Sequence, residues 1–187
     1  TYSKSGYSTY KGELTTIHRY AWNYKNDTTI NKGLGSNTWS TSLLNKTNLN
    51  QNFITNIGSD WAAKIDETTW KVGGNTYDNI ASKPAKTAYE NEINHPVTTN
   101  TTDNATEYKA KIGLMYASDY GFAAAPSAWT ANLSSYNDEA IKNVNWMYMG
   151  LVEWTISRNA NGASTVCDVL NAGGLYRSLA LNSYAVR

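Results

Sequence analysis

The stretch Asn145-Trp-Met-Tyr-Met-Gly-Leu-Val-Glu-Trp-Thr-Ile-Ser-Arg158 decides the fold that the sequence predicts. It holds two tryptophans, two methionines and three β-branched residues within fourteen positions. Large side chains stand at both its even and its odd positions, which is typical of a strand with both faces covered. Gly150 in the middle fits a β-bulge or a close backbone contact. The stretch therefore predicts a buried central strand around which the rest of the chain is organised.

One acidic residue, Glu153, lies inside that predicted strand. Burying a carboxylate is costly unless other groups hydrogen-bond it. Glu153 is therefore either a structural acceptor for nearby backbone and hydroxyl groups or the carboxylate of a functional site. We favour the structural interpretation, and we expect Trp146, Glu153 and Trp154 together to form the structural core.

The composition favours one globular domain over residues 1–187, in which residues 1–37 form a less regular N-terminal extension. The chain has 187 residues, of which 41% are hydrophobic, and this is enough to build one core. A formal net charge of +1 and 17% charged residues give neither a basic face for nucleic acid nor a polybasic segment for anionic lipid. No apolar run approaches the roughly 18 residues of a membrane-spanning helix, so no membrane contact is expected of this chain.

Apolar spacing predicts two helices in the first half of the chain. The first is capped by Ser40 or Thr41 and ends at Gly58, and the second follows Pro84 and stops before Pro96. Alternating apolar residues predict short strands around Trp70, over Tyr108–Tyr116, over Thr165–Leu170 and over Leu175–Leu181. Two helices in the first half of the chain, followed mostly by strands in the second half, indicate the α+β class with a mostly antiparallel and irregular sheet.

The residues that could carry catalysis form no recognised pattern. A Ser-His-Asp site needs a histidine held by a carboxylate, and both His18 and His95 lie in segments predicted as strand edge or loop. Gly33-Leu-Gly35 lacks the third glycine of a phosphate-binding loop. The single cysteine, Cys167, excludes a cysteine-built zinc site. We therefore assign no catalytic residue, no metal site and no cofactor.

Aromatic residues are the candidates for ligand binding, since the chain has 14 tyrosines and 7 tryptophans. An aromatic face offers a flat apolar surface to a sugar ring, and polar neighbours offer hydrogen bonds. Most of the tryptophans are expected to pack in the core, namely Trp39, Trp61, Trp70, Trp146 and Trp154. The remaining candidates for ligand contact are Trp22, Trp129, Tyr136 and Tyr176.

Two segments near the end of the chain resemble proteins of the formylglycine-generating-enzyme type, which have a C-type-lectin-like fold. Gly150-Leu-Val-Glu-Trp-Thr-Ile-Ser-Arg158 is similar to the Gly-Asn-Val-Trp-Glu-Trp-Thr stretch of that family. Val169 to Arg187, with Gly173-Gly174 and Arg177-Ser178, is similar to its final Gly-Gly-Ser-Trp, Arg and Gly-Phe-Arg elements. The resemblance implies a single C-type-lectin-like domain.

Residues 38–187 more closely resemble an uncharacterised group of surface domains in Gram-positive bacteria, often found behind a pilin-like leader. The motifs that carry this resemblance are Trp39-Ser-Thr-Ser-Leu43, Leu49-Asn50, Trp70-Lys-Val-Gly-Gly74, Ala88-Tyr-Glu-Asn-Glu-Ile93, Lys111-Ile-Gly-Leu-Met-Tyr-Ala-Ser-Asp-Tyr-Gly121 and Asn145-Trp-Met-Tyr-Met-Gly150. The resemblance implies display outside the cell, at the cell surface. Domains of that group usually continue with a further Leu-rich strand, so we expect the closing strand after Arg187 either to be absent or to lie outside this sequence.

Two departures from these families bear on function. The reactive cysteines of the enzyme lie in the segment that matches Gly173 to Arg187, which holds none, and the calcium motif of sugar-binding C-type lectins is also absent. We therefore expect a non-catalytic, adhesin-like binding domain whose partner is a glycan or a protein ligand at the cell surface. One alternative is a subunit that self-assembles into a surface filament, and a less favoured one is an enzyme of the formylglycine-generating type.

Overall fold

The computed structural model describes residues 36–73, 80–96, 106–159, 164–182 and 184–186, and the backbone of residues 19–20. Most of the predicted N-terminal extension, and Trp22 with it, lies outside the described residues. The helical elements are η2 (Leu44–Phe53), α2 (Ile54–Asn56), α3 (Ser59–Ala62), η3 (Ile80–Ser82), α4 (Ala85–Tyr89), η4 (Glu90–Asn94), α5 (Ala117–Phe122), η5 (Pro126–Ala128), η6 (Leu133–Asn137) and α6 (Glu139–Lys142). The strands are β1 (Arg19–Tyr20), β2 (Thr68–Lys71), β3 (Glu107–Ala110), β4 (Glu153–Arg158), β5 (Thr165–Val169), β6 (Leu175–Leu179) and β7 (Tyr184–Ala185). The predicted α+β class is confirmed.

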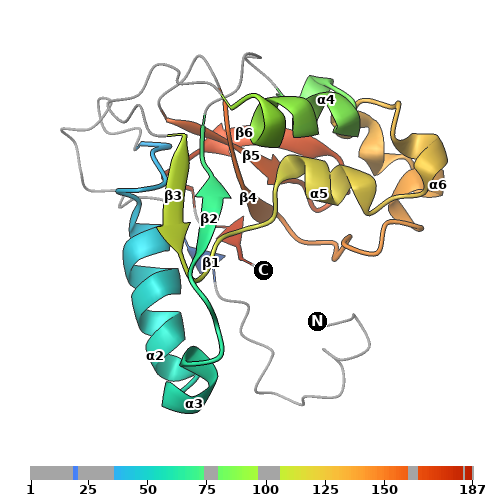
Figure 1. Ribbon diagram of the computed structural model, residues 1–187. Helices are drawn as coiled ribbons and strands as arrows, with labels where there is room; N and C mark the ends of the chain where they lie inside the picture. Colours follow the sequence, from blue (N-terminus) through green and yellow to red (C-terminus); the bar gives the residue numbers. More distant parts are fainter. Residues whose placement is uncertain are drawn as a thin grey trace, which may run out of the picture.

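The first predicted helix is present as η2, which continues without a break into α2. Its cap is Ser42 rather than Ser40 or Thr41, since the Ser42 hydroxyl accepts a hydrogen bond of 3.1 Å from the backbone N–H of Asn45. Gly58 ends the helix with a φ of 84°, a backbone angle that favours glycine. In Figure 1 this helix and α3 lie on one side of the molecule, away from α4, α5 and α6.

The second predicted helix is present as α4 and η4, and it packs beside α5. Ala85 and Ala88 of α4 are fully buried. Gly121 of α5 meets this face so closely that an added Cβ would lie 2.6 Å from the Cβ of Ala85. Small residues on both helices therefore set the short distance between them, and with it the position of α5 (Figure 1).

Strands β4, β5 and β6 form the predicted antiparallel meander. They belong to a curled five-stranded sheet of order β1-β7-β4-β5-β6, in which β7 pairs parallel to β4 and antiparallel to β1. A separate antiparallel hairpin joins β2 to β3, with Thr68 opposite Ala110. The sheet is thus mostly antiparallel, as expected, with the parallel β4–β7 contact as the exception.

Strand β4 separates two apolar clusters. Its even residues Trp154 and Ile156 belong to the cluster that contains Trp39 and Leu44. The other cluster gathers residues of α4, α5, η6, β5 and β6, among them Tyr120 and Leu133. The odd residues of β4, which are Glu153, Thr155 and Ser157, are polar and buried as well. Glu153 and Trp154 are therefore core residues, as predicted.

The first half of the predicted central strand is wrong, because β4 begins only at Glu153. Trp146, predicted to lie in the core, is 72% exposed, and Trp61 is 67% exposed. The cause at Trp146 is its neighbour Asn145, whose buried amide donates a 2.9 Å hydrogen bond to the carbonyl of Tyr120 and accepts one of 3.0 Å from the N–H of Met147. These bonds fold the backbone into a loop that turns the indole outward.

The predicted strand over Tyr108–Tyr116 is also shorter in the structure and ends at Ala110. Beyond it, the side-chain amide of Asn50 accepts from the N–H of Ile112 and donates to the carbonyl of the same residue, each at 2.9 Å. One side chain thus takes the place of a neighbouring strand at Ile112. The sheet does not continue through this segment, because the backbone N–H and the carbonyl of Ile112 are both already hydrogen-bonded.

Candidate functional site

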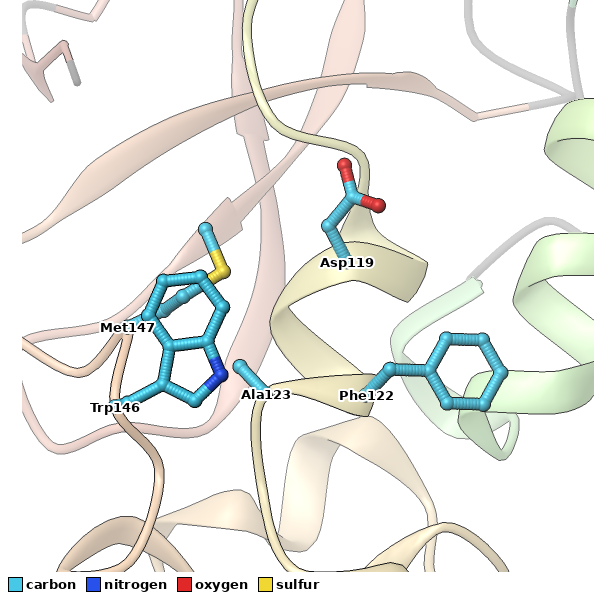
Figure 2. Close-up of a pocket in the computed structure, with 5 residues that line it drawn as sticks. All are labelled: Asp119, Phe122, Ala123, Trp146 and Met147. Atoms are coloured by element: carbon cyan, nitrogen blue, oxygen red, sulfur yellow. The ribbon is translucent and has the colours of Figure 1, made fainter.

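An open pocket of about 370 Å³ lies between helix α5 and the loop that follows α6. Its lining residues are Asp119, Phe122, Ala123, Trp146 and Met147. The first three come from α5 and from the residue that follows it. Figure 2 shows Trp146 and Met147 on the neighbouring loop, where they face the C-terminal end of α5 near Ala123.

The exposed indole of Trp146 is held in place by its backbone. The N–H of Trp146 donates to the carbonyl of Ala123 at 3.3 Å, and Asn145 on one side and Met147 on the other are both buried. The side chain therefore projects into solvent from a fixed base. An exposed aromatic ring on an anchored loop is typical of a ligand contact rather than of a core residue.

Among the described residues that line the pocket, Asp119 is the one that carries a charge. Its Oδ2 accepts a 2.9 Å hydrogen bond from the backbone N–H of Tyr116 and so caps the start of α5. Partial burial raises the pKa of this carboxyl, and the hydrogen bond from Tyr116 opposes that rise. Ionised Asp119 therefore gives the pocket a negative charge that no lining residue balances.

Phe122 extends the apolar lining toward α4. Its ring packs edge-on against Trp129, with ring centroids 5.1 Å apart, and against Tyr89 at 6.2 Å. In Figure 2 the Phe122 side chain points away from Trp146, so the two rings border the end of α5 from opposite sides. The pocket thus lies at the end of a row of aromatic residues that connects α4 and α5.

The sequence-predicted ligand residues are not brought together. Trp129 is half-buried, and its indole N–H donates to the carbonyl of Ala124 at 3.0 Å, so it supports the pocket without lining it. Tyr176 is 53% exposed on β6 and does not line the pocket. The prediction for Tyr136 is wrong, because its ring is fully buried and its hydroxyl contacts the carbonyls of Gly121 and Ala128 at 3.0 and 3.1 Å.

A second polar arrangement, centred on Glu92, is fully enclosed. Its carboxylate accepts from the Ser157 hydroxyl and, at 3.1 Å, from the N–H of Ser118. Burial raises the pKa of Glu92 to about 7, and the hydrogen bonds from the two serines oppose the rise. Because the group is buried among α5, η4 and β4, it joins these elements and is out of reach of a ligand.

Cys167 is equally enclosed in β5. Burial raises the pKa of its thiol well above the ordinary value, with the charge of Asp168 as the next cause. Within the described ranges, no group of three or more His, Cys, Asp and Glu side chains is arranged to hold a metal ion. Among the helices that the structure describes, none has both the length and the apolar character needed to cross a membrane.

Comparison of the chain with protein-family models, with curated proteins and with solved structures finds no match. The geometry of the pocket is therefore the basis for assigning a function.

Proposed function

We propose that the protein is a non-catalytic binding domain displayed at the cell surface, and that the pocket between α5 and the Trp146 loop is its ligand site. The observation that carries this proposal is the 72% exposed indole of Trp146, which is anchored through Asn145 and lines the same pocket as Asp119. Most large aromatic side chains contribute to folding when buried, whereas this one contributes little to packing. An exposed ring that is held on an anchored loop is free to stack against a ligand.

A glycan is the ligand that this pocket suits best. One face of a sugar ring carries mostly C–H groups and stacks on an aromatic ring, while its hydroxyls donate to a carboxylate. Trp146 and Met147 supply the apolar contacts, and Asp119 supplies the acceptor. The volume of about 370 Å³ falls in the range of roughly 300 to 1,000 Å³ that is usual for small-ligand sites.

The proposed domain type is C-type-lectin-like, as the sequence resemblance implies. Two helices early in the chain, the antiparallel β4–β5–β6 meander and long irregular connections support this organisation. The pocket is formed by a loop and a helix end, and in such folds recognition is carried by loops that a rigid scaffold positions. The enzyme alternative is disfavoured because Cys167, the single cysteine, is buried and holds its proton.

A glycan array followed by calorimetry on the best ligand tests the proposal. We expect Trp146→Ala to weaken binding by about tenfold or more. Stacking of a ligand ring on an aromatic side chain contributes on the order of 1 to 3 kcal/mol. Trp61→Ala is the matched control, because Trp61 is 67% exposed and lies outside the pocket. Retention of no glycan by the parent protein, or equal loss in both variants, contradicts the proposal.

A filament subunit is the second candidate function. It is favoured by exposed apolar side chains on the helical arm formed by η2, α2 and α3, where Phe53 is 45% exposed and Trp61 is more so. Exposed apolar side chains of this kind suit contact with another protein subunit. Electron microscopy and sedimentation at increasing concentration test this candidate. Assembly that Trp61→Ala abolishes and Trp146→Ala leaves intact supports the filament.

A further inference from the structure

We infer that the pocket selects ligands that carry a positive charge, and specifically glycans with unacetylated amino sugars. This inference rests on the proposed function of the pocket and adds the chemical class of its ligand. Its starting point is that Asp119 is the one charged group among the lining residues, while the other polar and apolar contacts come from Trp146, Met147 and Phe122.

The aromatic lining favours a cation. The face of an indole ring is negative, and tryptophan is the side chain on which an ammonium group stacks best. The thioether of Met147, next to Trp146, is polarizable and adds an attractive contact without hydrogen-bonding demands. An ammonium group stacked on the indole lies in the same pocket as the Asp119 carboxylate and is attracted by both.

The carboxylate of Asp119 discriminates against neutral ligands. Asp119 is an exposed residue, although its surroundings raise the pKa of its carboxyl, and a ligand that fills the pocket removes water from it. A neutral sugar offers hydroxyl donors but leaves the charge uncompensated, whereas a protonated amine neutralises it. The N-acetyl group of an acetylated sugar carries no charge and provides no such compensation.

Among the described residues that line the pocket, none is a cation that competes for this position. Lys142, on the preceding helix α6, forms an ion pair with Glu139 at 2.9 Å and does not line the pocket. Glu92, on the other side, is buried with a pKa raised to about 7, so below that pH it is mostly protonated and adds no second charge. The preference for a cation therefore rests on Asp119.

The test compares two glycans of equal length, an N-acetylglucosamine pentamer and the deacetylated glucosamine pentamer, at a pH where the free amines are protonated. We expect the parent protein to bind the glucosamine pentamer about tenfold more tightly, a difference that corresponds to roughly one favourable charge contact. Because the comparison changes the ligand, it tests the charge without any variant. A preference that falls steeply as salt is added is also expected.

Asp119→Asn then tests the assigned carboxylate. Asparagine keeps an oxygen that can accept from the Tyr116 N–H, so the cap is retained while the charge is removed. We expect the two pentamers to bind this variant within about twofold of each other. Asp138→Asn is the matched control, because Asp138 caps α6 in the same way, accepting from Ala140 at 2.8 Å, and lies outside the pocket.

The outcomes separate the inference from the function on which it rests. Equal or tighter binding of the N-acetylated pentamer overturns the inference and leaves the proposed function standing, as does a preference that survives in Asp119→Asn. Binding of lysine-rich peptides with no binding of the glucosamine pentamer also overturns the inference. If neither pentamer nor any other glycan binds, the proposed function itself fails. A melting curve for each variant confirms that the loss of binding is measured on folded protein.

Discussion

The carboxylate of Glu92 accepts a hydrogen bond from the hydroxyl of Ser157, and so joins the helix α4–η4 to strand β4 inside the protein. The same serine oxygen accepts from the N–H of Ala117 at 2.9 Å, at the start of α5. Three elements far apart in sequence thus meet at one buried carboxyl group. Since α5 carries Asp119 and Phe122, this network also holds one wall of the candidate pocket in position.

The first prediction concerns the pH dependence of stability. The pKa of Glu92 is raised from an ordinary 4.5 to about 7, so the folded protein keeps this proton where the unfolded chain loses it. The contribution of Glu92 is therefore most favourable below pH 4.5, declines as the pH rises toward 7, and is constant above that. Between pH 5 and pH 8 the free energy of unfolding should fall by about 2 to 3 kcal/mol from this group.

Urea unfolding of the parent and of Glu92→Gln at both pH values measures this contribution. Glutamine has nearly the same shape and no titration, so the decline should shrink by the amount attributed to Glu92. A remaining decline is expected from Asp168, whose pKa burial likewise raises to about 7. An identical pH dependence in the two proteins would show that Glu92 ionises normally.

Two tryptophans of the same predicted strand should respond in opposite ways to truncation. Trp154 is fully buried and packs against Tyr184 with ring centroids 4.6 Å apart, so Trp154→Ala should lower the free energy of unfolding by about 3 to 5 kcal/mol. Trp146 is mostly exposed, so Trp146→Ala should change it by about 0.5 kcal/mol or less. Equal losses in chemical denaturation would mean that the Trp146 loop packs inward.

The contrast between the two tryptophans shows which parts of the fold could be predicted from the sequence and which could not. Local signals that act directly on the backbone predict the ends of the two helices, before Gly58 and before Pro96. Strands β5 and β6 were predicted in the same way. The loop at Trp146 has the composition of a strand. It is turned outward by the amide of Asn145, which reaches the carbonyl of Tyr120 twenty-five positions earlier, and periodicity carries no information about such a contact.

The candidate site was missed for the same reason. Tyr136 was expected in a binding loop, yet its hydroxyl finds two carbonyls inside the protein, which allows the whole side chain to be buried. Asp119 lies within the motif Lys111–Gly121, and in the structure its carboxylate accepts from the N–H of Tyr116 at the start of α5. Its place beside Trp146 depends on the packing of α5, which no local pattern encodes.

The packing of α5 against α4 gives the third prediction. In Gly121→Ala, a better helix former gains up to about 1 kcal/mol, but the new methyl group would lie 2.6 Å from the Cβ of Ala85 and 2.7 Å from Cδ2 of Leu133. Overpacking of this kind costs typically about 1 to 3 kcal/mol, so a net loss of stability is expected. The double variant Gly121→Ala with Ala85→Gly should lose less than the sum of the two single variants, as measured by urea denaturation. A Gly121→Ala protein more stable than the parent would mean that the helices can move apart freely.

The last prediction concerns Glu153, the first residue of β4, which is 3% exposed and lies between Val169 of β5 and Ala185 of β7. A carboxylate is retained at such a depth only where other groups of the protein hydrogen-bond it. Glu153→Ala removes this buried side chain and the interactions that it makes between β5 and β7, so the free energy of unfolding should fall by about 1 to 3 kcal/mol. Glu67→Ala, at an exposed position just before β2, is the control and should change it by about 0.5 kcal/mol or less. Should Glu153→Ala unfold at the same urea concentration as the parent, Glu153 is not a structural anchor, and the central strand is held by its apolar residues and backbone pairing alone.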